Sequence, residues 1–184
     1  MTNRLFISAD LDEEIKNIII KIRDEIYGFD RNIKWETKDK LHFTLKFLGE
    51  VEQNKNHFII SELEKVTKNY KTINCSFASF GLFKKGVNPS ILWLGINYNN
   101  DFNNLAKTIN NNLFNYGFPK ESRTFKPHLT LLRIKGKEDL KGINDFLDYK
   151  LPEIKFNINK LSLMKSELHR SGSVYSQIKS FKLN

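Results

Sequence analysis

PHLTLLRI, at residues 127–134, repeats the pattern of LHFTLKFLG, at residues 41–49, because both read His-x-Thr-Leu within an apolar run. The two histidines, His42 and His128, lie 86 residues apart (128 − 42). Each run is rich in large apolar residues and lies between turn signals, so each is predicted to be a β-strand. Side chains alternate between the faces of a strand, so each histidine shares a face with the threonine two positions later.

Strict alternation assigns every other side chain of these strands as well. Thr44 and Thr130 lie on the faces of the two histidines, and Lys46 joins the first of them as a strand-end lysine to which we assign no catalytic role. The opposite face of the first strand is expected to enter the core with Phe43, Leu45 and Phe47. Two such strands side by side would form a pocket that holds two imidazoles and two hydroxyls.

A single histidine beside a threonine is more often a hydrogen-bonded structural residue than a catalyst. Two copies in matching apolar frames, from a total of four histidines, favour function instead. The other two histidines, His57 and His169, lie outside any motif and are predicted to be surface residues.

The composition describes one domain with ample core material. The chain has 184 residues, 40% of them hydrophobic, and includes 15 phenylalanines. Its net charge of +9 favours polyanionic partners, nucleic acid first, although the lysines are spread along the chain and form no basic tail. The single cysteine, Cys75, excludes an internal disulfide and a thiolate zinc site, and we expect it to be a small buried residue.

Neither end of the chain nor its interior carries a membrane signal. The first ten residues are too short and too polar for a signal peptide. No apolar segment approaches the roughly 20 residues needed to cross a bilayer. We therefore expect a cytoplasmic protein without membrane contact, and a monomer.

Periodicity predicts alternating strands and helices around the two motifs. Strands are expected at 5–9, 33–35, 73–83, 91–96, 154–164 and 174–181, and helices at 12–28, 58–66, 102–113 and 140–147. A basic turn at 84–89 would join two strands into a hairpin, and 167–173 would form a polar turn. Trp35 is expected to be a half-buried strand aromatic. Each motif follows a strand and a helix and precedes another helix, so we predict a mixed α/β fold with two similar lobes facing each other across a cleft.

The residue types point to acid–base chemistry. Zinc usually takes three or four protein ligands, and the motifs supply two histidines without companion Cys, Asp or Glu. Neither a Gly-x-Ser-x-Gly elbow nor a glycine-rich phosphate loop is present. An imidazole pair can accept one proton and donate another near neutral pH, which suits in-line displacement at a phosphate ester. The threonine hydroxyls could hold the non-bridging oxygens.

The sequence resembles the two-histidine phosphoesterases, and within them the RNA 2′,3′-cyclic phosphodiesterases formerly called 2′-5′ RNA ligases. The resemblance covers nearly the whole chain and is carried by residues 4–7, 41–49, 91–93, 117–119 and 125–133. It implies an α+β fold for residues 1–184, with two pseudo-symmetric lobes of mostly antiparallel sheet, helices outside and a central cleft. It also implies His42 and His128 as the catalytic pair, with Thr44, Thr130 and Arg133 on the phosphate.

Arg133 fits simple alternation poorly. It falls on the face of Leu129 and Leu131, away from His128, and would reach the cleft only from the strand end or past a bulge. A surface residue at the strand end is the alternative.

We expect a phosphodiesterase that needs no metal or other cofactor and opens terminal 2′,3′-cyclic phosphates on RNA, or on nucleosides, to 2′-phosphates. His128 would act as base toward water and His42 as acid toward the ribose O3′. Two alternatives stay open: a non-catalytic RNA- or nucleotide-binding module, and an enzyme that cleaves or joins 2′-5′ linked oligonucleotides. Lys84 and Lys85 of the basic turn are expected to contact further backbone phosphates, unless they only solvate the turn.

Overall fold

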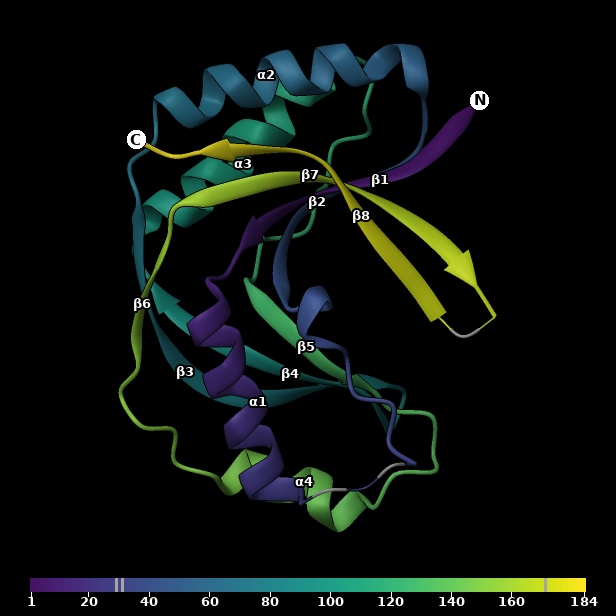
Figure 1. Ribbon diagram of the computed structural model, residues 1–184, viewed down its shortest axis with the longest axis vertical. Helices are drawn as coiled ribbons and strands as arrows, with labels where there is room; N and C mark the ends of the chain where they lie inside the picture. Colours follow the sequence, from purple (N-terminus) through teal and green to yellow (C-terminus); the bar gives the residue numbers. More distant parts are fainter. Residues whose placement is uncertain (29, 31, 171) are drawn as a thin grey trace.

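The computed structural model describes residues 1–28, 30, 32–170 and 172–184, and it contains two four-stranded sheets (Figure 1). The first sheet has the order β2-β1-β7-β8, with bounds His42–Glu52, Thr2–Asp10, Lys160–His169 and Gly172–Lys182. The second has the order β5-β4-β3-β6, with bounds His128–Arg133, Asn88–Tyr98, Ile73–Lys85 and Lys155–Ile158. All paired strands run antiparallel, which confirms the predicted α+β class with two similar lobes.

The helices lie outside the sheets and are exchanged between the lobes. They are α1 (Glu13–Tyr27), α2 (Asn56–Lys68), α3 (Asn100–Phe114) and α4 (Leu140–Asp148), with short 3₁₀ turns at Lys38–Lys40 and Gln53–Lys55. α1 follows β1 of the first sheet but packs with α4 beside the second; α3 follows β4 of the second sheet but packs with α2 and β2 (Figure 1). The exchange couples the two lobes through their cores.

Aromatic side chains fill the core on both sides of this exchange. Phe43 from β2 meets Phe102 from α3 edge to face, with ring centroids 5.8 Å apart, and both are fully buried. Phe80 from β3 packs on Phe146 from α4 at 5.0 Å. The apolar side of the first motif is thus fixed by a helix from the other half of the chain. Cys75 is buried as predicted.

Four element predictions needed correction. The basic turn expected at 84–89 is reduced to Gly86 and Val87, because β3 extends to Lys85 and β4 begins at Asn88. The single strand expected at 154–164 is two strands in different sheets, β6 and β7, separated at Asn159. The strand expected at 33–35 is reduced to one bridge between Trp35 and Leu132, although Trp35 is half-buried as predicted. The turn expected at 167–173 is shorter, because β7 extends to His169 and β8 begins at Gly172; residue 171 lies outside the described residues.

The predictions for the two histidines outside the motifs held. His57 and His169 are exposed. Within the described ranges, no helix is long and apolar enough to cross a membrane.

Candidate active site

The two His-x-Thr motifs occupy the edge strands that meet between the lobes. β2 is the edge of the first sheet and β5 the edge of the second, and the two strands contact each other in the centre of the molecule (Figure 1). Phe43 and Leu129, which each follow a histidine, are fully buried. The histidines and threonines are half-buried. The alternation predicted for His-x-Thr is therefore confirmed in both strands.

A β-bulge in β5 brings Arg133 to the face of His128. Trp93 of β4 pairs with Thr130 and the preceding Leu92 pairs with Leu132, so the ladder passes over Leu131. A bulge of one residue reverses the alternation beyond it. Leu131 and Leu132 are consequently both buried, and Arg133 turns out of the core. The bulge therefore explains how Arg133 reaches the face of His128, which strict alternation along the strand did not allow.

The same irregularity occurs in β2 and corrects two predictions. Ser8 of β1 pairs with Thr44 and Ile7 pairs with Lys46, so the ladder passes over Leu45. Lys46 is therefore buried on the core side, not on the face of His42, with 5% of its surface exposed. Phe47, expected in the core, is 72% exposed on the side of His42.

Lys46 is a structural residue behind the site. Its Nζ donates to Asn110 Oδ1 at 2.6 Å and to the carbonyl of Pro119 at 2.7 Å. Burial lowers the pKa of this ammonium, and the charge of Glu121 opposes that shift. The contacts tie β2 to α3 and to the loop that follows it.

The two bulges make Phe47 and Arg133 equivalent, since each is the fifth residue after its histidine. The ring of Phe47 lies 6.2 Å from that of Phe6, which stacks on His42 at 5.0 Å. Phe47 was missed in the sequence because alternation placed it in the core. The signal that could have found it is its match to Arg133 in the second motif.

Each imidazole is held by aromatic neighbours. His42 lies between Phe6 and the edge of Tyr175, whose ring centroid is 5.6 Å away. His128 meets Phe83 edge to face at 4.9 Å and Trp93 at 6.4 Å. These contacts restrict the rotation of both rings.

Backbone carbonyls two residues upstream also bind both imidazoles. His128 Nδ1 lies 2.8 Å from the carbonyl of Lys126, and His42 is hydrogen-bonded by the carbonyl of Lys40. A carbonyl can only accept, so the Nδ1 of His128 carries the proton and its Nε2 is left for other chemistry.

Trp93 reaches His128 because two glycines lie under its indole. A Cβ at Gly81 would lie 2.2 Å from the Trp93 ring, and one at Gly95 would lie 2.9 Å from it. Real side chains do not approach so closely, so only glycine lets the ring lie flat on the sheet. Phe83 then packs against the indole at 5.4 Å.

The environment of His42 disfavours its charged form. Burial lowers the pKa of His42 to about 4, and the charge of Asp10 partly opposes this shift. His42 is therefore neutral near pH 7 in the free protein. An anion bound beside it would raise its pKa again.

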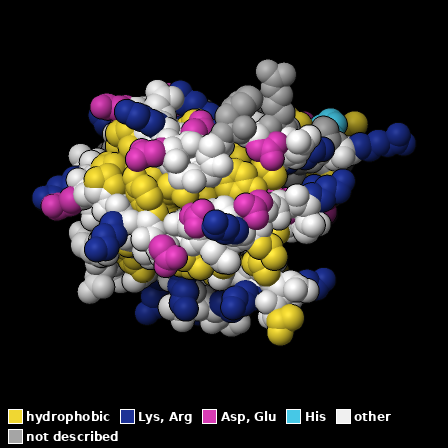
Figure 2. Space-filling model, turned by 90° about the horizontal axis from the view of Figure 1, so that it is seen from below, with side chains coloured by type: hydrophobic (Ala, Val, Ile, Leu, Met, Phe, Trp, Pro, Cys, Tyr) yellow, Lys and Arg dark blue, Asp and Glu magenta, His cyan; other side chains and the backbone are white. Residues whose placement is uncertain are grey.

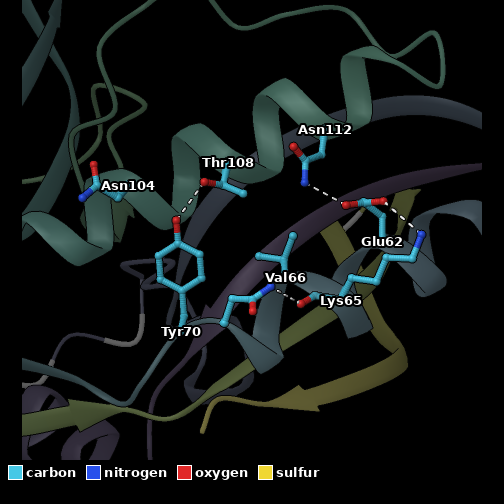
Figure 3. Close-up of a pocket in the computed structure, with 8 residues that line it drawn as sticks. Glu62, Lys65, Val66, Tyr70, Asn104, Thr108 and Asn112 are labelled. Atoms are coloured by element: carbon cyan, nitrogen blue, oxygen red, sulfur yellow. Dashed lines mark hydrogen bonds and ion pairs between the residues drawn. The ribbon is translucent and has the colours of Figure 1, made fainter.

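Two other kinds of site, a metal centre and a surface groove, were considered. Among the described residues, no group of three or more His, Cys, Asp or Glu side chains could hold a metal ion. A groove between α2 and α3 lies on the outer side of the first sheet (Figure 3). Its polar side chains bond to one another, Glu62 with Asn112 at 2.7 Å and Tyr70 with Thr108 at 2.8 Å, and it contains no motif residue.

Comparison with protein families identifies the arrangement: residues 12–170 match the 2′-5′ RNA ligase superfamily. The chain belongs to this superfamily. It is 33% identical to the RNA 2′,3′-cyclic phosphodiesterase of Methanocaldococcus jannaschii, over 96% of this chain and 98% of the relative. It is 28% identical to the enzyme of the same name from Methanothermobacter thermautotrophicus, over the full length of both.

Two solved structures share the fold of this chain. The apo crystal structure of E. coli LigT aligns with a TM-score of 0.77 and 24% identity, over 100% of this chain and 98% of LigT. TT0787 of Thermus thermophilus aligns with a TM-score of 0.80 and 22% identity, over 98% and 97% of the two chains.

Proposed function

We propose that this protein hydrolyses the terminal 2′,3′-cyclic phosphate of RNA to a 2′-phosphate, without a metal ion. The observation that carries the proposal is the pair of His-x-Thr motifs on adjoining edge strands, each with its imidazole held in place by main chain and aromatic rings. The relatives named RNA 2′,3′-cyclic phosphodiesterase support this activity class.

The reaction needs one proton acceptor and one proton donor. His128 Nε2 takes a proton from the attacking water while the water oxygen bonds to phosphorus. The bond from phosphorus to O3′ breaks, and His42 gives its proton to O3′. His42 can serve as this acid because the bound phosphate anion restores the imidazolium that burial disfavours. Each positioned group typically contributes about 10²–10⁴ in rate.

Thr44, Thr130 and Arg133 would bind the phosphate. The threonine hydroxyls share the faces of the histidines and can donate to non-bridging oxygens. Arg133 adds a guanidinium, which suits phosphate geometry and stabilises the charge that grows on these oxygens in the transition state.

The assignment of His128 as base and His42 as acid can be tested with a substrate whose leaving group needs no proton. An aryl phosphodiester whose phenolate leaves without a proton needs a base but no acid. His42→Ala should then keep near-wild-type turnover of the aryl ester, whereas His128→Ala should lose it. The opposite pattern would exchange the two roles.

The activity is tested by product analysis on a short RNA ending in a 2′,3′-cyclic phosphate. We expect conversion to a 2′-phosphate end in the presence of EDTA. A 3′-phosphate product would contradict the proposed cleavage of the bond to O3′, and tight binding without turnover would support a non-catalytic module. A 5′-hydroxyl RNA added to the same reaction reports any 2′-5′ joining, in which the 5′-hydroxyl attacks phosphorus in place of water and the bond to O3′ breaks as before. E. coli LigT has been crystallised with 3′-AMP, so a nucleoside cyclic phosphate is a suitable minimal substrate.

A further inference from the structure

Glu36 is an acidic side chain beside a phosphate site, where a negative charge would by itself hinder an anionic substrate. It lies in the segment between α1 and β2, and its carboxylate Oε1 accepts from Arg133 Nε at 3.1 Å. The side chain of Glu36 is 16% exposed, whereas that of Arg133 is 57% exposed. The buried partner of this ion pair is therefore the acid.

The backbone holds Glu36 firmly against the bulge of β5. Its N–H donates to the carbonyl of Leu131 at 2.8 Å, and the preceding Trp35 bridges to Leu132. The Trp35 ring is fixed between Tyr27, at 5.3 Å, and Phe146, at 5.7 Å. The second lobe thus presents Glu36 directly beside Arg133.

The ion pair uses only part of the guanidinium. Within the described residues, Arg133 Nε bonds to Glu36, and no protein acceptor bonds to either Nη. Arg123 shows the contrast, because both its Nε and its Nη2 bond to the carboxylate of Glu121. A guanidinium anchored through Nε keeps its outer Nη pair for two parallel bonds to a phosphate.

Contacts with the first lobe place this ion pair close to His42. Lys40 Nζ lies 3.9 Å from Glu36 Oε2 and 5.9 Å from the centroid of the Tyr175 ring. Tyr175 in turn contacts His42. Burial raises the pKa of Tyr175, the charge of Glu36 adds to this shift and that of Arg133 opposes it, so both charges lie near Tyr175.

We propose that Glu36 is a positioning residue for Arg133, and that it holds the guanidinium through Nε so that the Nη pair faces the reacting phosphate. The inference rests on the proposed role of Arg133 in the reaction. Lys40 and Arg133 compensate the charge of Glu36, so what remains is its effect on the orientation of a long, flexible side chain.

Charge and orientation are separated by comparing Glu36→Gln with Glu36→Ala. Both variants remove the negative charge, but glutamine keeps an oxygen that can accept from Arg133 Nε. We expect Glu36→Ala to have a kcat/KM for a nucleoside 2′,3′-cyclic phosphate about 10- to 100-fold below that of Glu36→Gln, as misplacement of a binding group typically costs. Glu64→Ala, which breaks an ion pair with Lys179 between α2 and β8, is the control and should match the wild type.

The same comparison in an Arg133→Ala background tests whether Glu36 acts through Arg133. We expect the alanine and glutamine variants to become equal there. A difference that persists without Arg133, or equal values in its presence, would overturn the proposal.

Binding of inorganic phosphate, measured by calorimetry in the same variants, gives a readout that needs no turnover. Glu36→Gln should bind phosphate at least as tightly as the wild type, and Glu36→Ala more weakly than Glu36→Gln. Tighter binding by both variants to the same degree would show that Glu36 acts by charge alone, and would overturn the proposal. If Glu36→Ala binds phosphate more weakly than Glu36→Gln only when Arg133 is present, and the wild type hydrolyses no cyclic phosphate, the proposed function is refuted but the role of Glu36 stands.

Discussion

Phe47 exposes 72% of its surface on the side of His42, next to Phe6. An exposed ring beside a reacting ribose phosphate offers a stacking surface for the terminal base, and such contacts are worth about 1–3 kcal/mol per base. We therefore predict that Phe47→Ala lowers kcat/KM for a nucleoside cyclic phosphate by roughly 5- to 150-fold, while Phe47→Tyr stays near the wild type.

Phe58 provides the matched control for this prediction. It is 44% exposed on α2, away from both motifs, so Phe58→Ala should not change kcat/KM. Equal kinetics for Phe47→Ala and the wild type would show that the base does not use this ring.

The low pKa of His42 predicts the acid side of the pH profile. The mechanism requires one neutral and one protonated imidazole, so activity falls at pH values where both are protonated. Because burial lowers the pKa of His42 to about 4, the second protonation takes place near that pH. We expect kcat/KM, which reports the free enzyme, to fall on acidification through this range. Asp10→Asn should move this acidic limb of the pH profile, where kcat/KM falls, to lower pH, because the charge of Asp10 raises the His42 pKa.

Circular dichroism at each pH separates this limb from acid unfolding. A limb that stays in place in Asp10→Asn, or a flat profile down to about pH 3.5, would contradict the assignment to His42.

Among the secondary-structure elements, β2 depends on Lys46 for its attachment to α3. Lys46→Ala removes the donor to Asn110 and Pro119, and the loss of a buried charged hydrogen-bonding group costs about 1–3 kcal/mol. We predict a lower free energy of unfolding by that amount in urea titrations. The exposed Lys65 on α2 is the control, with a change within about 0.5 kcal/mol on replacement by alanine. The prediction fails if the two variants are equally stable.

The β3–β4 hairpin extends from His128 toward a basic tip. Phe83 contacts His128, and the next two residues, Lys84 and Lys85, are exposed. If they contact phosphates upstream of the reacting one, Lys84→Ala/Lys85→Ala should weaken oligonucleotide binding. It should also reduce the slope of log affinity against log salt by about 0.7 per lost contact. Hydrolysis of a nucleoside cyclic phosphate should stay nearly unchanged.

The control for this prediction is a double variant that removes the same two positive charges from another part of the surface. On the α1–α4 end of the molecule, acidic and basic side chains are interspersed and do not gather in one patch (Figure 2). Lys65→Ala/Lys107→Ala removes the same charge from α2 and α3. Identical salt slopes for the two double variants would mean that Lys84 and Lys85 only solvate the turn.

At the level of the molecule, the site is shared between lobes whose helices are exchanged. His42 belongs to the first sheet and His128 to the second, while α1 and α3 each cross to the other lobe. The segment at Trp35 and Glu36 adds a second link, since it bridges to β5 before the chain enters β2. The geometry of the site therefore depends on the packing of both halves.

The sequence predicted the strands, helices and duplicated motifs because their signals are local. Apolar periodicity placed α2 and α3, and the His-x-Thr spacing placed each histidine with its threonine. The two bulges carry no such signal, since Leu45 and Leu131 are ordinary apolar residues in apolar runs. Lys46, Phe47 and Arg133 were therefore assigned to the wrong faces by alternation.

Two further features depend on contacts between distant segments. The exchange of α1 and α3 follows from the connections between sheets, which periodicity does not specify. Glu36 meets Arg133 from 97 residues away, and a lone acid in a loop gives no sign of that partner in the sequence.

The central claim is that His42 and His128 together hydrolyse a cyclic phosphate without a metal ion. It is tested most directly by turnover of a 2′,3′-cyclic phosphate in EDTA by the wild type, His42→Ala and His128→Ala. We predict full activity for the wild type and a loss of about 10²–10⁴ for each variant, with folding unchanged. Near-wild-type turnover by either variant, or wild-type activity that EDTA abolishes and zinc restores, would contradict the claim.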